Sequence, residues 1–360
     1  MTLCLCLTIA ACGDGDPSSQ AGASVADSAS SAVSSETGAP SSSDTASEVS
    51  SSQAGESESS GSYPVTISNF NYAKEPVEYT YEKAPERVIT FWTNSLEIML
   101  ALGLEDRVIC AVGMEEESVL PELQGELKKC TDQMEYYNDF KDSNAALSKE
   151  SAVMMEPDFI LGWKSTFSDK TIGDVDYWNE NGVGTYMALN SNDISENRTL
   201  ENEYADILNI GKIFGVEEKA QALVDDMKAE VEKITAATQG QEVQTVMVIE
   251  FMKDNIWAYD KTMLVGDMVQ AMGGELLETG EDLGAEDVVA ADPQVILIIG
   301  DQEDADSLCN GPAYASLQAV QNKRVYPIDL SEVYTSGVRT GMGLNHIGRA
   351  LYPELYEEAE

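Results

Sequence analysis

The sequence predicts an α/β protein with two doubly wound, Rossmann-like lobes, joined by a long backbone helix and separated by a ligand cleft. First, short apolar runs suited to buried parallel strands alternate with helical patterns along most of the chain. Second, a unit made of Glu, a short helical stretch, an acid before Pro and an apolar run occurs twice, at 150–161 and 286–297. Third, about 300 residues follow a polar N-terminal segment, which is more than one hydrophobic core usually covers.

Residues 1–12 predict a lipoprotein signal segment. The apolar run from Leu3 to Ala11 is too short to span a bilayer, and small residues precede Cys12. A secretory signal normally has a positively charged start, which is missing here, so we expect the natural start to lie upstream. The segment resembles the bacterial lipoprotein cleavage signal, in which this cysteine becomes the acylated first residue. The alternative is a chance cysteine in a leader that is simply removed.

Residues 13–62 predict a disordered, Ser-rich and acidic tether. They consist almost entirely of Ser, Ala, Gly, Thr, Asp and Glu, with no aromatic and no basic residue. Such a segment cannot bury enough apolar surface to offset the conformational entropy that is lost on ordering. We therefore expect the folded part to begin at residue 63.

The apolar runs that follow predict the strands of the two lobes. They occur at 88–91, 108–112, 159–161, 246–251, 295–299 and 325–328. Residues 200–214 and 217–238 have helical periodicity and are separated by Gly215, which favours a helix end. We place the N-terminal lobe at 63–198, the backbone helices at 199–238 and the C-terminal lobe at 239–360. A rigid helix between the lobes would limit hinge closure.

Composition excludes several classes of function. The chain has 64 acidic and 21 basic residues and a formal net charge of −43, so it would repel nucleic acid. The single histidine, His346, rules out metal sites built from several histidines, and we find no catalytic constellation. We interpret His346 as a packing or surface residue on a terminal helix rather than a haem ligand. Two alternatives are open for Cys110, Cys130 and Cys309. Two of them form a disulfide and the third is a free thiol, or all three are free thiols.

Loops that follow the expected strands should line the cleft, because ligands of doubly wound sheets bind beyond the carboxyl ends of the strands. Aromatic residues in these loops suit a large, partly apolar ligand. Arg339 is expected to hold an anionic group, since its planar fork matches a carboxylate or phosphate, and Lys164 is a second candidate. The alternatives are core packing for each aromatic and an internal salt bridge for Arg339. The expected ligand-binding residues are Trp92, Thr93, Asn94, Trp163, Lys164, Phe251, Trp257, Tyr259, Tyr334 and Arg339.

Four segments carry a resemblance to a known family. The chain contains, in order, PERVITFWTNSLEIMLALGLEDRVICAV, LSKESAVMMEPDFILGW, LGAEDVVAADPQVILI and YASLQAVQNKRVYPID. Behind a lipoprotein signal and a tether, they are similar to the helical-backbone solute-binding proteins of iron-siderophore, haem and cobalamin importers, over residues 85–353. The resemblance implies one acidic docking contact per lobe for arginines of the permease, and these align with Glu150 and Glu286. A compatible second interpretation is that the dipole of a helix N-terminus favours each acid.

The resemblance implies an extracellular substrate-binding lipoprotein of an ABC transporter, which is not an enzyme and has no resident metal or cofactor. We expect it to capture a ferric siderophore-type iron complex, a small-molecule metal chelate, and to deliver it to the permease with its ATPase. Arg339 and Lys164 favour this ligand, because they would balance an anionic complex.

Two alternatives remain to this expected function. One is binding of cobalamin, another corrinoid or haem within the same importer family. The other, from a different class, is a ligand-binding surface sensor without transport. In each case we expect a monomer held by its lipid anchor on the extracellular face of the bacterial cytoplasmic membrane, with no nucleic-acid partner.

Overall fold

The structure, a computed structural model, describes residues 62–137, 147–191, 197–253, 255–278, 280 and 282–356. Residues Ser57–Glu360 belong to one compact unit of the chain. The expected signal segment with Cys12, and all of the expected tether except its last residue, lie outside the described residues. Within the described part, no helix is both long and apolar enough to cross a membrane.

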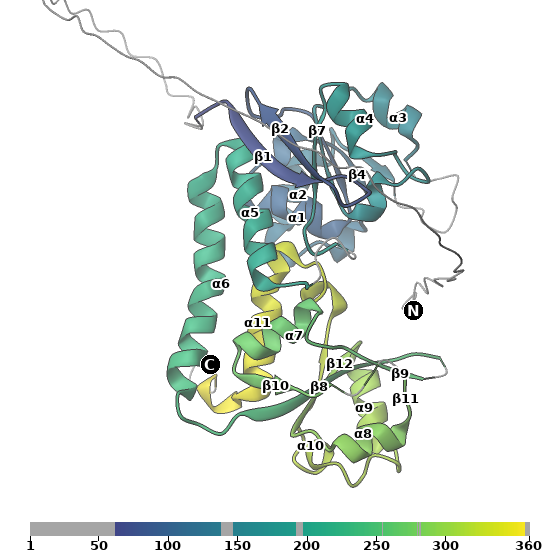
Figure 1. Cartoon of the computed structure of the whole chain (residues 1–360), viewed down its shortest axis with the longest axis vertical. Coiled ribbons are helices and arrows are strands. Elements are labelled where there is room, and N and C mark those ends of the chain that lie inside the picture. Colours follow the sequence, from purple (N-terminus) through teal and green to yellow (C-terminus); the bar gives the residue numbers. More distant parts are fainter. Residues whose placement is uncertain are drawn as a thin grey trace, which may run out of the picture. The chain divides into compact units, whose positions relative to one another are not determined.

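The N-terminal lobe contains a five-stranded parallel sheet in the order β5-β4-β3-β6-β7 (Figure 1). Its strands are β3 (Val88–Phe91), β4 (Val108–Val112), β5 (Glu135–Tyr137), β6 (Phe159–Gly162) and β7 (Gly184–Met187). Its helices are α1 (Thr93–Ala101), α2 (Gln124–Cys130), α3 (Lys149–Met154) and α4 (Val175–Glu180). An antiparallel pair, β1 (Val65–Phe70) and β2 (Pro76–Tyr81), precedes the sheet. The apolar-run criterion does not find β1, β2, β5 or β7, because polar residues or glycine interrupt them.

The C-terminal lobe contains a mixed sheet in the order β11-β9-β8-β12-β13, with β10 also paired to β8. Its strands are β8 (Gln244–Phe251), β9 (Ile256–Ala258), β10 (Gly274–Leu276), β11 (Asp282–Leu283), β12 (Val295–Ile299) and β13 (Val325–Ile328). Its helices are α7 (Leu264–Ala271), α8 (Ala285–Ala291), α9 (Gln302–Asn310), α10 (Gln318–Gln321) and α11 (Thr340–Leu351). Pairing is parallel among β10, β8, β12 and β13 and antiparallel from β8 to β9 and from β9 to β11.

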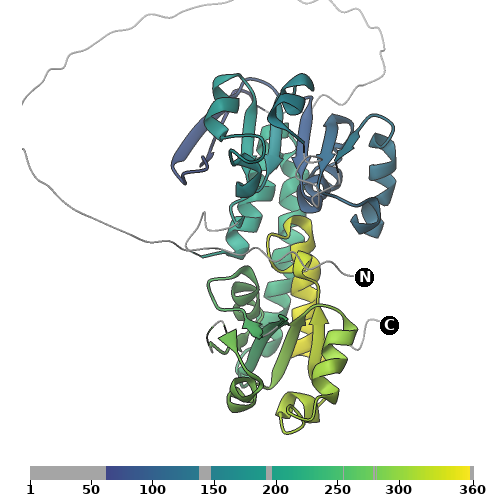
Figure 2. The same cartoon turned by 90° about the vertical axis from the view of Figure 1, so that its right-hand side faces the viewer.

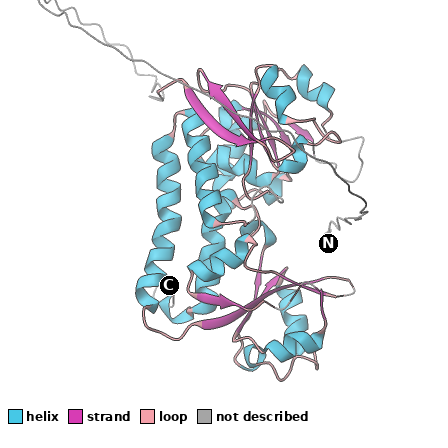
Figure 3. Ribbon diagram, viewed as in Figure 1, coloured by secondary structure: helices cyan, strands magenta, loops and turns pink. Residues whose placement is uncertain are grey.

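Two helices form the spine between the sheets, as the sequence predicts. They are α5 (Leu200–Phe214) and α6 (Glu217–Thr238), with Gly215 between them at a φ of 68°. A side chain at Gly211 would bring its Cβ within 2.4 Å of Ala220, so this glycine permits the close approach of the two helices. Figure 3 shows α5, α6 and α11 between the two sheets, and Figure 2 shows the sheets at opposite ends of this spine.

The main hydrophobic core is continuous from the N-terminal lobe through the spine into the C-terminal lobe. It includes Leu96 of α1, Ile207 of α5 and Leu297 of β12. Each sheet also has a second, separate core on its other face, because successive side chains of a strand point to opposite faces. Opening the lobes would therefore disturb shared packing along the spine, which favours limited hinge motion.

The three cysteines of the described part are free thiols. Cys110 and Cys130 are buried, and Cys309 is exposed. Burial raises the pKa of the Cys110 thiol to about 12 and that of Cys130 to about 11, so both stay protonated and unreactive near neutral pH. Of the two alternatives left open by the sequence, the structure shows three thiols.

Candidate ligand-binding site

A pocket of about 480 Å³ lies where strands of both sheets end. Its lining includes Trp92 after β3, Gly113 after β4 and Trp163 after β6. From the C-terminal lobe it includes Asp329 and its neighbours after β13. The pocket thus occupies the position expected for a doubly wound fold, beyond the carboxyl ends of parallel strands.

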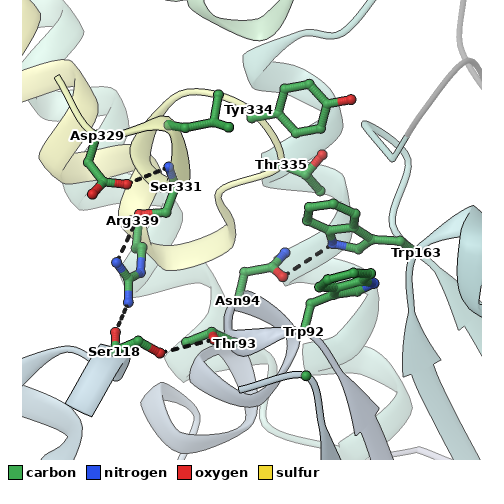
Figure 4. Close-up of a pocket in the computed structure, with 12 residues that line it drawn as sticks. Trp92, Thr93, Asn94, Ser118, Trp163, Asp329, Ser331, Tyr334, Thr335 and Arg339 are labelled. Carbon is green, nitrogen blue, oxygen red and sulfur yellow. Dashed lines mark hydrogen bonds between the residues drawn. The ribbon is translucent and has the colours of Figure 1, made fainter. Parts of the chain in front are cut away.

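Three aromatic side chains, Trp92, Trp163 and Tyr334, form the aromatic wall of this pocket. The rings of Trp92 and Trp163 are stacked, with centroids 4.9 Å apart and planes inclined by 26°. The centroid of the Tyr334 ring lies 5.9 Å from that of Trp163. The Trp163 indole nitrogen donates to the Asn94 side-chain oxygen at 3.2 Å, which fixes the orientation of the ring (Figure 4).

The backbone at Trp92 is held in an unusual conformation. Its φ of 72° is rare for a bulky residue and costs conformational energy. The Trp92 backbone nitrogen donates to the Val112 carbonyl at 2.7 Å, which ties the end of β3 to the end of β4. At this position the chain turns directly from β3 into α1, and the Trp92 side chain lines the pocket.

Ser118, Asp329, Ser331 and Arg339 form the polar side of the pocket. Figure 4 shows Asp329, Ser331 and Arg339 across from the two tryptophans. The exposed Asp329 carboxylate caps the 3₁₀ helix η6 (Leu330–Glu332) by accepting from the Ser331 backbone nitrogen at 2.7 Å. An apolar wall opposite polar groups suits a ligand with a broad hydrophobic face and a polar edge.

Arg339 lines the pocket but is engaged in an internal ion pair. It ends the 3₁₀ helix η7 (Gly337–Arg339), and its Nε and Nη2 donate to the two carboxylate oxygens of Glu97 at 2.7 and 2.6 Å. Glu97 belongs to α1 and is fully buried. Arg339 also donates to the Ser331 hydroxyl at 2.9 Å and to the Ser118 carbonyl. The structure therefore shows the internal salt bridge, and a ligand contact by Arg339 stays a prediction.

Six of the ten expected ligand-binding residues line this pocket, and Lys164, Phe251, Trp257 and Tyr259 do not. Phe251 and Trp257 pack against the hydrophobic cores of the lobe, and the Tyr259 hydroxyl donates to the Glu250 carboxylate at 2.8 Å. The physical reason is that β8 turns into the antiparallel strand β9 instead of a loop that enters a helix.

Lys164 is not part of the pocket lining, and its amino group lies 5.2 Å from the centroid of the Tyr72 ring. Ligand contacts by Lys164, Phe251, Trp257 and Tyr259 stay predictions without support from the pocket geometry.

Six residues line the pocket that were not among the expected ligand-binding residues. They are Gly113, Ser118, Asp329, Leu330, Ser331 and Thr335. The strand-end rule identifies Gly113 and residues 329–331, because they directly follow the apolar runs 108–112 and 325–328. No local signal marks Ser118, whose position in the pocket depends on the fold of the segment between β4 and α2.

His346 lies outside the pocket, on α11. Its Nδ1 lies 2.6 Å from a carboxylate oxygen of Glu332, and the side chain is about half exposed. The hydrogen bond to Glu332 raises the pKa of the imidazole above its ordinary value. The position on a terminal helix agrees with the interpretation of His346 as a packing or surface residue.

A buried carboxylate lies behind the pocket, at the junction of the spine and the segment that leads to Arg339. Glu203 of α5 accepts from the Asn190 side chain at 2.7 Å and from the Gly337 backbone nitrogen at 2.6 Å. Burial raises the pKa of Glu203 to about 7. The neighbouring buried Asp206 also has a raised pKa, first through burial and then through the charge of Glu203.

We expect the stability of the protein to fall as the pH rises from 6 to 8. The pKa of Glu203 is higher in the folded state than in the unfolded chain, so its contribution is present at low pH and is lost as the pH rises through about 7. One such group changes the free energy of unfolding by about 1.4 kcal/mol over this window, or the melting temperature by roughly 2 to 5 °C. Circular dichroism melts at each pH measure the change.

The control for this prediction is a pair of single variants. Glu203→Gln should make the pH dependence of the free energy of unfolding shallower. His346→Gln measures how much of this pH dependence comes from the His346–Glu332 pair, which also weakens as the pH rises through the raised pKa of His346. An equal slope in the wild type and in Glu203→Gln would contradict the prediction.

Glu150 and Glu286 occupy equivalent positions in the two lobes. Glu150 is in the first turn of α3, which precedes β6, and Glu286 is in the first turn of α8, which precedes β12. Both side chains are exposed. The helix N-terminal positions are as the sequence predicts, and the exposure meets the first requirement of a docking contact.

Comparisons with known proteins agree with this architecture. The family model described as periplasmic binding protein matches residues 182–331. A Bacillus subtilis protein named as the uncharacterised ABC transporter substrate-binding lipoprotein YvrC is 25% identical over 303 residues, which cover 82% of this chain and 88% of that protein.

Solved structures extend the match over most of the chain. A periplasmic binding protein from Veillonella parvula is 30% identical with a TM-score of 0.74, covering 82% of this chain and 93% of its own. A structure from Saccharomonospora viridis, titled as an ABC-type Fe3+-hydroxamate transport system, is 20% identical with a TM-score of 0.62, covering 80% and 99%. The chain therefore belongs to the periplasmic binding protein family, the substrate-binding proteins of ABC transporters, and is not an enzyme.

Proposed function

We propose that this protein captures a ferric siderophore-type iron complex outside the cell and delivers it to the permease and ATPase of an ABC importer. As a substrate-binding protein of an ABC transporter, it takes a small-molecule ligand and works with a membrane permease. The observation that carries the proposal is the pocket of about 480 Å³, in which the aromatic wall lies across from polar groups. This pocket suits a large chelate with an apolar face and a polar edge.

Two classes of ligand are candidates within the family. The Saccharomonospora viridis structure, which its title assigns to Fe3+-hydroxamate transport, supports an iron complex. The stacked rings of Trp92 and Trp163 would also pack against a flat macrocycle, so a corrinoid such as cobalamin, or haem, is the second candidate. Arg339 and Lys164 do not favour an anionic siderophore in this structure, because Arg339 is paired with Glu97 and Lys164 does not line the pocket.

The attachment of the protein to the membrane is part of the proposal. A lipid on Cys12 would hold the chain at the extracellular face of the bacterial cytoplasmic membrane, with residues 13–62 as the tether and the folded unit as a monomer. The name of the Bacillus subtilis relative as a lipoprotein supports this arrangement. Mass spectrometry of the membrane-extracted chain would show an acylated Cys12 as the first residue.

The proposed function is tested by titrating the full chain with ferric tricatecholate, ferric trihydroxamate, haemin and cyanocobalamin in a calorimeter. We expect one of the two ferric complexes to bind with a dissociation constant below about 1 µM. The Trp163→Ala variant should bind it roughly tenfold to thirtyfold more weakly, because the variant removes the central ring of the aromatic wall.

The control for this prediction is Tyr177→Ala, which removes an exposed aromatic side chain of α4 away from the pocket. Its affinity should equal that of the wild type. Binding of cyanocobalamin or haemin alone would favour the second candidate. If none of the four binds, the ligand class is wrong, and intact uptake in a deletion strain would then favour a surface sensor.

A further inference from the structure

The expected anion anchor of the pocket, Arg339, has little capacity left for a ligand. All three of its guanidinium nitrogens donate to protein acceptors, and its charge is balanced by the fully buried Glu97 carboxylate at 2.6 Å. A bidentate arginine–carboxylate pair of this kind is already close to its best geometry. An anionic ligand would have to compete with Glu97, so a different cation is needed to attract it.

Arg198 is a cation beside the aromatic wall that forms no ion pair with any carboxylate in the described part of the chain. It precedes α5 and is half-buried, and its guanidinium carbon lies 4.4 Å from the centroid of the Tyr334 ring. Its Nη1 lies 3.3 Å from the sulfur of Met263, which is a weak acceptor. Among the residues that the structure describes, no carboxylate forms an ion pair with Arg198. The carboxylates of Glu250, Asp260 and Asp267 accept hydrogen bonds from Tyr259, Thr262 and Leu200, and none of the three forms an ion pair with Arg198.

The position of Arg198 relative to the pocket follows from two ring contacts. Tyr334 lines the pocket and packs against Trp163, and Arg198 stacks on the Tyr334 ring. The guanidinium is therefore one side chain away from the pocket. Its backbone is fixed by a hydrogen bond from the Arg198 nitrogen to the Thr262 carbonyl at 2.8 Å. A stacked guanidinium keeps the N–H groups of its edge free to donate.

The negative charge of the protein makes a cation beside the pocket important for binding an anionic ligand. The chain has a formal net charge of −43, and the exposed Asp329 carboxylate lines the same pocket. An anionic ligand is therefore repelled by most of the protein surface. A half-buried cation such as Arg198 is screened less than an exposed one and can offset this repulsion locally.

We propose that Arg198, and not Arg339, meets the anionic group of the ligand at the edge of the aromatic wall, so that the pocket selects an iron complex bearing negative charge on that side. This inference rests on the proposed function, because it concerns the ligand of the same pocket. In this arrangement Tyr334 positions the guanidinium, while Trp92 and Trp163 contact the apolar face of the complex.

The test uses ferric trihydroxamates of one scaffold that differ only in charge. Their terminal amine is left free, acetylated or succinylated, so the complexes carry one positive charge, no charge or one negative charge. Calorimetry on the full chain should show that Arg198→Gln weakens binding of the succinylated complex by roughly tenfold to a hundredfold relative to the acetylated one. Arg198→Lys should keep part of the preference, because it keeps the charge.

The matched control is Arg349→Gln. Arg349 also stacks on a tyrosine, with its guanidinium carbon 5.0 Å from the centroid of the Tyr356 ring, and is exposed away from the pocket. The Arg349→Gln variant should bind all three complexes with the affinities of the wild type. An equal loss for all three complexes in Arg198→Gln would indicate a structural role only, and no loss would show that Arg198 is not the anchor. Either result would overturn the inference.

A measurement without a chelate separates this inference from the proposed function. If the wild type binds none of the three complexes, the proposed ligand class fails, and Arg198 is then tested with iodide as the probe. Iodide should quench tryptophan fluorescence less effectively in Arg198→Gln than in the wild type, relative to neutral acrylamide, and Arg349→Gln should show no change. An unchanged ratio of iodide to acrylamide quenching would mean that Arg198 attracts no anion to the aromatic wall.

Discussion

Replacing Arg339 by methionine is expected to lower the free energy of unfolding by about 3 to 5 kcal/mol. The variant leaves the Glu97 carboxylate fully buried without its bidentate partner. Glu97 would keep one hydrogen bond, from the Leu120 backbone nitrogen at 2.8 Å, which does not balance its charge. Urea denaturation followed by far-ultraviolet circular dichroism measures the loss.

The double variant Glu97→Gln with Arg339→Met identifies the cause. If the uncompensated charge is responsible, the double variant is more stable than Arg339→Met alone, because no charge remains buried. Lys83→Met is the surface control, since the Lys83–Glu86 pair is exposed on both sides and should contribute no measurable stability. A double variant as unstable as the single one would show that shape and packing, not charge, explain the loss.

Removing both docking carboxylates is expected to abolish transport without weakening ligand binding. In Glu150→Ala with Glu286→Ala, uptake of a radiolabelled ferric complex by cells should fall to the level of a deletion strain. The reason is that the two exposed acids lie in the first turns of equivalent helices and belong to neither side of the pocket. The dissociation constant of the same complex, measured by calorimetry, should stay within about twofold of the wild type.

A matched control removes two acids from another helix start. Glu217 and Glu218 are exposed in the first turn of α6, so Glu217→Ala with Glu218→Ala makes the same change of charge and the same loss of helix-dipole contact. This variant should transport normally. Equal loss of uptake in both double variants would mean that total charge, not the two specific sites, governs the encounter with the permease.

Local patterns were sufficient for six of the thirteen strands in the described part of the chain and for both spine helices. Strands β3, β4 and β12 begin and end with the apolar runs, because a strand buried on both faces is rich in apolar residues. The spine helices have the predicted bounds because Gly215 adopts a positive φ that ends the first of them. Polar or alternating strands such as β1 and β5 were not found, since their residues lack that continuous apolar signal.

The strand-end rule predicted the pocket where each strand leads into a loop and a helix or 3₁₀ helix. Trp92 and Trp163, which follow β3 and β6, line the pocket. Phe251 and Trp257 do not line it, because β8 continues into the antiparallel strand β9. An apolar run predicts that a strand is buried but not which strand it pairs with next, so this difference depended on the tertiary fold.

The sequence by itself determined the two lobes, the helical spine and the aromatic residues at strand ends. These follow from composition and from patterns within a few residues of each other. Only the tertiary structure decided that Arg339 pairs with Glu97 and that Arg198 stacks on Tyr334. The partners in these contacts are far apart in sequence, and Coulomb energy depends on the distance between charges in space and on their burial, neither of which the order of residues reveals.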